Sequence, residues 1–228
     1  MKSYSALTMN TLSPTAHEAI ILRRLPYGEA DLIVTFLSAS AGKLKGIARH
    51  AKRSQKRFSG CLEPGTQVEI TAQARPGSEL MVIHEARQRE WPALREFPQM
   101  AALGVALEVV DHCWPLQQAS PEKFQLVAAF LEKLAESPAP VPTLVSFLGA
   151  FLKLAGFLAN WEASSSLGDA GLDAHKEWVD HALTWPLAAP VPAAVYAPLL
   201  RFLENYISHL VEKPLKSSAY WPLLAEAL

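Results

Sequence analysis

Seven positively charged side chains gather in the fifteen residues 43–57, and no acidic residue interrupts them. Because like charges repel one another, folding stability alone does not favour such a cluster. Cations at this density bind phosphates, since each neutralised phosphate releases condensed counterions, and arginine also stacks on unpaired bases. The segment therefore predicts nucleic-acid binding, against the alternative of a solvated loop kept for solubility. Its cations are Lys43, Lys45, Arg49, Lys52, Arg53, Lys56 and Arg57.

The chain carries no recognisable enzyme motif. The pair Gly42–Lys43 lacks the Ser or Thr that follows the lysine of a phosphate-binding loop, because Leu44 stands there. Cys113 follows an aspartate and a histidine on an apolar helical segment, but no neighbouring cation is at hand to activate its thiol. We therefore expect a buried thiol and a protein that is not an enzyme.

Metal and cofactor sites are also not expected. The two cysteines, Cys61 and Cys113, are too few for a four-cysteine zinc site or a disulfide framework. The acidic, histidine-bearing stretch 169–181 has no convincing ligand spacing. We predict neither a metal nor a cofactor.

The charge is divided unevenly along the chain. Residues 1–89 hold 13 lysines and arginines against 7 acidic residues, whereas residues 90–228 hold 8 against 15. The net charge of −1 thus hides a basic first part and an acidic second part. This asymmetry indicates two domains, of which only the first has an anionic partner.

The first part has the pattern of short strands and turns. β-branched and aromatic residues alternate with polar ones between turn residues such as Gly28, Gly42 and Gly77. Five strands in about seventy residues suit a small closed barrel, so we predict a five-stranded OB-fold over 16–90, after a flexible tail at 1–15. The strands are expected at 19–22, 32–37, 44–49, 68–72 and 80–83.

After residue 91 the apolar residues recur at three- and four-residue steps, which predicts helices. A proline-rich stretch at 137–142 separates the second helix from the third. The predicted fold is α+β in two domains, with an all-helical domain at 91–228. Its helices are expected at 100–114, 120–134, 144–158, 193–211 and 217–227.

Several stretches resemble the bacterial RecO family. The run 17–32, HEAIILRRLPYGEADL, is similar to the family's first strand pair. The stretch 42–49, GKLKGIAR, and the basic loop that ends in 62–65, LEPG, resemble its third strand and the connection to the fourth. In the second part, 152–157 and 214–217 resemble the family's central helix and its closing signature.

The resemblance implies a DNA repair and recombination mediator in the cytoplasm, associated with the nucleoid. Such a protein would bind single- and double-stranded DNA, anneal complementary strands, partner RecR, and help RecA load onto strands covered by single-strand-binding protein. Arg23 and Arg24, within the first run, join the seven cations as expected DNA contacts.

The chain departs from the family pattern at two places that bear on the site. Many members carry a four-cysteine zinc module after the central helix, but residues 160–190 contain no cysteine, so no zinc module is expected. The usual glycine before the basic loop is His50 here. The conformation of the loop is therefore expected to differ.

The resemblance also implies that the helical domain holds the acidic C-terminal tail of single-strand-binding protein. An apolar groove with a basic rim would suit such a peptide, although the same apolar residues would also suit a core. The expected partner-binding residues are Leu103, Leu107, Lys123, Phe130, Lys133, Phe147, Phe151 and Lys216.

Two other functions compete with this one. The first is a protein-interaction adaptor whose basic loop has no direct DNA role, and the second is an RNA-binding OB-fold protein. No apolar run approaches the length of a membrane span, so no membrane association is expected.

Overall fold

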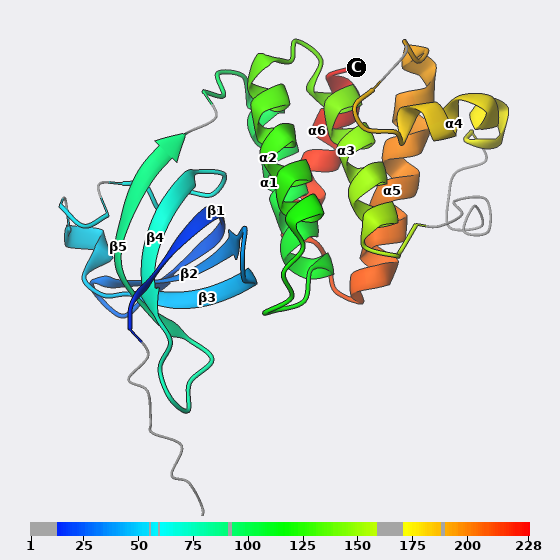
Figure 1. The fold of residues 1–228 in the computed structure, drawn as a ribbon. Helices are drawn as coiled ribbons and strands as arrows, with labels where there is room; N and C mark the ends of the chain where they lie inside the picture. The colour runs from blue at the N-terminus through cyan, green and yellow to red at the C-terminus, as the bar shows by residue number, and fades with distance from the viewer. Residues whose placement is uncertain (1–12, 55, 59, 91–92, 159–170, 188–189) are drawn as a thin grey trace, which may run out of the picture.

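The structure is a computed structural model that describes residues 13–54, 56–58, 60–90, 93–158, 171–187 and 190–228. It consists of a β-barrel followed by a helical domain (Figure 1). The α+β architecture expected from the sequence is confirmed. Most of the predicted tail lies outside the described residues, and the first strand begins at Thr15.

Five strands close the barrel in the order β1-β2-β3-β5-β4. All neighbouring pairs are antiparallel except β3 and β5, which are parallel. This closure is that of an OB-fold, as predicted. The strands are β1 (Thr15–Tyr27), β2 (Asp31–Ser38), β3 (Gly42–Ala48), β4 (Gln67–Gln73) and β5 (Met81–Glu90).

The alternation of side chains fixes the barrel interior. On β4, Val68, Ile70 and Ala72 are buried while the residues between them are half-buried. They pack with Phe36 of β2 in the core of the barrel. Because successive side chains point to opposite faces of a strand, the same alternation exposes a second set of residues on the outside of the barrel.

The helical domain contains more helical segments than the sequence predicted. The short helix α4 was missed, because seven residues are too few for a clear periodic signal. Helix α3 begins at Pro140, inside the proline-rich stretch that was expected to separate the second helix from the third, since proline is tolerated in the first turn. The helices are α1 (Phe97–Cys113), α2 (Pro121–Glu136), α3 (Pro140–Leu154), α4 (Lys176–Ala182), α5 (Tyr196–Val211) and α6 (Tyr220–Glu226). The 3-10 turns are η1 (Ala51–Arg53), η3 (Asp173–His175), η4 (Ala193–Val195) and η5 (Lys216–Ala219).

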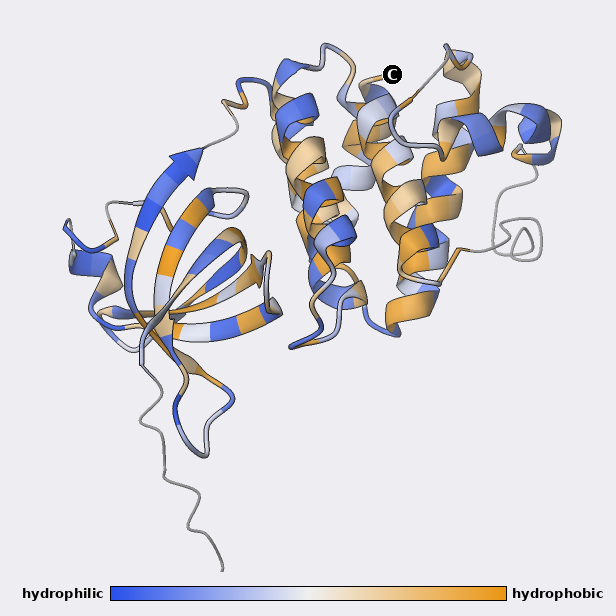
Figure 2. Cartoon of the chain, in the orientation of Figure 1, coloured by the Kyte–Doolittle hydropathy of each residue, from blue (hydrophilic) through white to orange (hydrophobic). Residues whose placement is uncertain are grey.

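Helix α3 lies in the middle of the helical domain, and its ribbon is mostly hydrophobic (Figures 1 and 2). Phe147 of α3 stacks on Phe130 of α2 with ring centroids 4.2 Å apart. Phe147 also contacts Phe151 at 5.8 Å. Aromatic packing of this kind fixes α2 and α3 against each other. Within the described residues, no helix is long and apolar enough to cross a membrane.

The two domains share a packed interface. Ile20, Leu22 and Leu37 point outward from the barrel and belong to the hydrophobic core of the helical domain. The backbone N–H of Gln117 donates to the carbonyl of Lys43 at 2.9 Å. The helical domain therefore covers one part of the barrel's outer surface and leaves the rest open.

Candidate nucleic-acid interface

The basic segment forms most of the loop between β3 and β4. The loop turns away from β3 at His50, whose φ of 56° is the left-handed conformation that glycine adopts most easily. The carboxylate of Asp31 accepts a hydrogen bond from the backbone N–H of His50 at 2.7 Å. His50 thus takes the backbone conformation that glycine, the usual residue at this position in the family, adopts most easily.

Hydrogen bonds to backbone carbonyls hold the loop in place. Lys52 donates from its backbone N–H to Ala30 at 3.0 Å and from its ammonium to Gly28 at 2.8 Å. The guanidinium of Arg57 donates to the carbonyl of Arg49 at 2.8 Å. These bonds neutralise no charge, because their acceptors are neutral carbonyls. The loop has a defined shape while its cations keep their charge.

The second half of the loop closes one end of the barrel. Phe58, Cys61 and Leu62 are buried in the barrel core. Burial raises the pKa of the Cys61 thiol, which is consistent with an inert packing role. The backbone N–H of Ala86 on β5 donates to the carbonyl of Arg57 at 2.9 Å. This closure presents the preceding charged residues on the surface, where η1 has a hydrophilic ribbon (Figure 2).

The structure brings six of the expected DNA-binding residues together. Arg24 comes from β1 and forms an ion pair with Glu63 at 2.7 Å on the side of the loop. It lines a cavity of about 560 Å³ together with Lys52 and Arg53. The six exposed cations are Arg24, Arg49, Lys52, Arg53, Lys56 and Arg57.

Two of the expected contacts, Lys43 and Arg23, belong to the domain interface instead. The side chain of Lys43 is buried, and its ammonium lies 3.3 Å from the carboxylate of Asp111 on α1 and donates to the carbonyl of the same residue. Arg23 reaches the other oxygen of that carboxylate at 3.3 Å. Lys43 and Arg23, which were expected to contact DNA, therefore pair with a carboxylate of the helical domain.

Lys45 takes a third position, half-buried on the outer face of β3 opposite Thr35 of β2. It lies in the middle of β3, before the loop that carries the exposed cations begins. Lys45 therefore remains available on the barrel surface but is not part of the loop cluster.

Sequence reasoning missed an apolar row across the outer face of the barrel. Leu25, Ile33, Ile47 and Val82 are cross-strand neighbours on β1, β2, β3 and β5. Each is partly exposed. For Ile33, Ile47 and Val82 the reason is alternation, because a residue beside each of them in the chain belongs to the barrel core. Ile33 and Ile47 alternate with the interior residues of their strands, which places them on the outer face. This alternation is visible in the sequence and could have predicted the apolar row.

One aromatic side chain lies at the edge of this row. Tyr27, the last residue of β1, is 55% exposed. It precedes Gly28, whose carbonyl binds the ammonium of Lys52. Phe36 of β2, another aromatic residue before the loop in the sequence, is fully buried. Tyr27 thus offers a stacking surface for a base beside the cations.

The expected partner groove is not formed. The apolar residues proposed for it belong to the core of the helical domain: Leu103, Leu107, Phe130, Phe147 and Phe151. All five are at most 8% exposed. They were chosen for their helical spacing, which marks a buried face as readily as a groove.

The expected basic rim is dispersed. The ammonium of Lys123 lies over the ring of Trp114 at 5.4 Å from its centroid. Lys133 is exposed on α2. Lys216 shares a cavity of about 290 Å³ with Leu107 and Arg23 at the domain interface. Of the expected partner-binding residues, only Leu107 and Lys216 come together around an opening.

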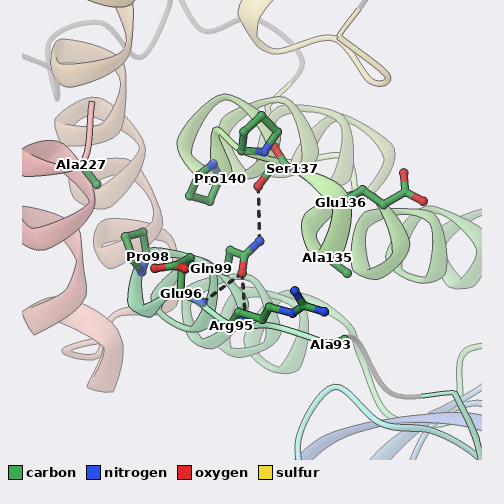
Figure 3. Close-up of a pocket in the computed structure, with 11 residues that line it drawn as sticks. Ala93, Arg95, Glu96, Pro98, Gln99, Ala135, Glu136, Ser137, Pro140 and Ala227 are labelled. Atoms are coloured by element: carbon green, nitrogen blue, oxygen red, sulfur yellow. Dashed lines mark hydrogen bonds between the residues drawn. The ribbon is translucent and has the colours of Figure 1, made fainter.

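Another cavity, of about 580 Å³, lies where α1 begins (Figure 3). The side-chain amide of Gln99 forms part of the cavity wall. Its oxygen accepts hydrogen bonds from the backbone N–H groups of Arg95 and Glu96, and its nitrogen donates to the carbonyls of Leu134 and Ser137. These four bonds use the amide fully. The residue ties α1 to the end of α2 and has no group left for a ligand.

In the part of the chain that the structure describes, no group of three or more potential metal ligands lies together. The stretch 169–181, weighed as a metal site and set aside, begins outside the described residues. Cys113 is buried, and burial raises the pKa of its thiol to about 11. Such a thiol is protonated at neutral pH and is a poor nucleophile.

Comparison with known proteins matches both domains. A family model described as the N-terminal part of Recombination protein O matches residues 12–90, and one for its C-terminal part matches residues 94–183. A protein of Anaeromyxobacter sp. (strain K) named DNA repair protein RecO is 30% identical over 212 residues, which cover 88% of this chain and 83% of that protein.

Two further relatives carry the same name. The protein of Koribacter versatilis (strain Ellin345) is 38% identical over 143 residues, which cover 62% of this chain and 58% of that protein. The protein of Geobacter sulfurreducens is 30% identical over 161 residues, which cover 69% of this chain and 65% of that protein. From the match of both domains and from these relatives, the chain belongs to the RecO family.

Proposed function

We propose that this protein is a DNA repair and recombination mediator that binds single-stranded DNA through the basic loop and the adjoining outer face of the barrel. The observation that carries the proposal is the arrangement of six exposed cations beside Tyr27 and the apolar row. Cations hold phosphates, and the aromatic and apolar side chains contact bases that only an unpaired strand exposes. The names of the relatives support DNA repair as the broad role.

The finer activities rest on the family. By analogy with it, the protein anneals complementary strands, partners RecR, and helps RecA load onto strands covered by single-strand-binding protein. A surface that holds a backbone without reading base edges supports annealing, because such contacts accept any sequence.

The salt dependence of binding tests the loop. With about four phosphate contacts to a single strand, the logarithm of the affinity should fall against the logarithm of the salt concentration with a slope near −3. Replacing Arg53, Lys56 and Arg57 with Ala should flatten this slope and leave the fold intact. The matched control replaces three exposed lysines of the helical domain, Lys133, Lys176 and Lys213. An unchanged slope in the folded loop variant would contradict the proposal.

Two measurements separate the competing functions. Annealing of complementary strands by the purified protein favours the mediator over the adaptor, which has no direct role on DNA. Matched DNA and RNA strands of one sequence distinguish the mediator from an RNA-binding protein. Tighter binding to RNA would favour the RNA-binding function.

For the acidic tail of single-strand-binding protein, the structure favours a different place from the expected groove. The cavity at the domain interface is lined by Leu107 and Lys216, and also by Glu108 and by Arg23 with its partner Asp111. An apolar residue of the tail would lie beside Leu107, and its carboxylate would lie beside Lys216. A labelled tail peptide should bind the full chain at low salt, and Lys216→Ala should weaken the binding. Binding that survives removal of the peptide's terminal apolar residue would contradict this site.

A further inference from the structure

The cavity beside the basic loop has walls of two chemical kinds. One wall is apolar and comes from Leu32, Phe58 and Leu62, which are 7%, 1% and 3% exposed. The other wall is cationic and comes from Arg24 of β1 and from Lys52 and Arg53 of η1. A ligand that fills this space needs an apolar body and an anionic group attached to it.

The cavity is preformed by contacts that do not involve a ligand. Lys52 is fixed to Ala30 and Gly28, as described above, and His50 is fixed to Asp31. On the opposite side, Arg24 is held by Glu63 at 2.7 Å. Because the walls are already ordered, a ligand pays little conformational entropy to enter.

The size of the cavity, about 560 Å³, lies within the range of about 300 to 1,000 Å³ that small-molecule sites have. A nucleotide has the required shape and chemistry, since a flat base is joined through a sugar to a phosphate. Its base would lie beside Ala51 and Leu32, and its phosphate would lie near Lys52 and Arg53.

We propose that this cavity holds one unstacked nucleotide of a bound single strand. The inference rests on the proposed function and adds a subsite to it. A nucleotide in a duplex is stacked on both faces and paired with one base of the opposite strand, so extruding it costs a few kcal/mol. The cavity therefore favours single strands over duplexes, which the exposed cations alone do not do.

Filling the cavity without removing any charge gives a direct test. Ala51 lines the cavity and is only half-buried, so Ala51→Phe places a ring in the space meant for the base. We expect about a tenfold loss of affinity for an oligothymidylate strand, the scale of one base contact, and no change for a duplex of equal length. Ala74→Phe, at an exposed position in the β4–β5 turn, is the matched control and should change neither affinity.

Free thymidine monophosphate provides the second arm, because it has the same chemistry as a nucleotide in a strand. Its binding should be far weaker than that of the strand and should be lost in Ala51→Phe. If free nucleotide binds as tightly as the strand, the cavity is a nucleotide site unrelated to the strand, and the inference is overturned.

The wild-type protein supplies a readout that needs no variant. A strand carrying 5-iodouracil, photocrosslinked to the full chain, should form an adduct with one of the cavity-lining residues between Ala51 and Leu62. An adduct at Tyr27 with none at residues 49–62 would overturn the inference, as would equal single-strand affinity of wild-type and folded Ala51→Phe protein. A wild-type protein that binds no DNA would instead refute the proposed function itself.

Discussion

Lys43 of β3 and Asp111 of α1 form a buried ion pair across the domain interface, with the ammonium nitrogen 3.3 Å from a carboxylate oxygen. The same ammonium donates a hydrogen bond to the backbone carbonyl of Asp111. Arg23 of β1 binds the second carboxylate oxygen, so one aspartate serves two cations of the barrel. Burial lowers the pKa of Lys43, and the nearby carboxylate opposes that shift. Polar contacts of this geometry fix the angle at which the domains meet.

Removal of the carboxylate should leave the Lys43 ammonium buried without a counter-charge. We expect Asp111→Ala to lower the free energy of unfolding by about 3 kcal/mol, the usual cost of breaking a buried pair. The double variant Lys43→Met with Asp111→Leu should cost less than Asp111→Ala, because it leaves only the partly exposed Arg23 without a counter-charge and no buried ammonium. Urea unfolding of the variants provides the measurement. A loss below about 1 kcal/mol for Asp111→Ala would mean that the pair behaves like a surface salt bridge.

Gly42 lies where the barrel comes closest to the helical domain. A Cβ atom at this position would stand 2.1 Å from the backbone carbonyl oxygen of Gln118, and φ is +74°. Gly77 has nearly the same φ, +73°, with open space around its Cβ position. Gly77→Ala should therefore cost only the left-handed strain of about 1–2 kcal/mol.

Gly42→Ala should cost clearly more than Gly77→Ala, since it adds a backbone clash to the same strain. Thermal unfolding of the two variants compares them directly. Equal losses of stability would show that the domains separate easily enough to relieve the clash.

The barrel and its basic loop could be predicted from sequence because both depend on local patterns. The alternation of apolar and polar residues predicted which side chains of β4 point into the barrel, and a run of cations without acidic residues identified the loop. The domain interface could not be predicted in the same way. Lys43 and Asp111 are far apart in the chain, and nothing local distinguishes the buried Lys43 from Lys45, which is only half-buried.

The burial of the apolar residues expected to bind a partner could not be predicted, for a related physical reason. Helical spacing shows which residues share a face, but it does not show whether another helix covers that face. Phe130 and Phe147 share the apolar faces of two helices that pack against each other, so they stack in the core. The exposure of Tyr27 could not be predicted either, because the sequence around it does not show that this last residue of β1 is 55% exposed.

Glu63 should weaken DNA binding, because its carboxylate pairs with Arg24 beside the proposed nucleotide cavity. Glu63→Gln removes this negative charge and frees the guanidinium for phosphate. We expect affinity for single-stranded DNA to rise by about three- to tenfold at low salt, with a steeper salt slope. Glu69→Gln is the matched control, since Glu69 pairs with Arg89 on the β4–β5 side of the barrel. An equal effect of both variants would indicate a general charge effect and no role for the Arg24 pair.

Glu108 of α1 fastens the start of η5 to the helical domain. Its two carboxylate oxygens accept hydrogen bonds from the backbone N–H groups of Lys216 and Ser217 at 2.8 and 2.7 Å. Burial on its own raises the pKa of Glu108, but these hydrogen bonds outweigh it, and the pKa lies below its ordinary value. The folded state therefore binds the proton of this carboxyl less tightly than the unfolded state does.

The sign of the resulting pH dependence follows from this lowered pKa. The stabilisation by Glu108 should be complete above the unfolded pKa of about 4.5 and should be lost as the pH falls through the lower folded value. Glu108→Gln should reduce stability at neutral pH and flatten the acid limb of a plot of unfolding free energy against pH. His17, whose pKa burial lowers, also reduces stability as the pH falls, but it does so in both proteins, so the test is the difference between wild type and variant below pH 5. Glu132→Gln, at an exposed position on α2, should leave the acid limb as it is. A Glu108→Gln variant with an unaltered acid limb would show that the two backbone bonds do not depend on the charge of Glu108.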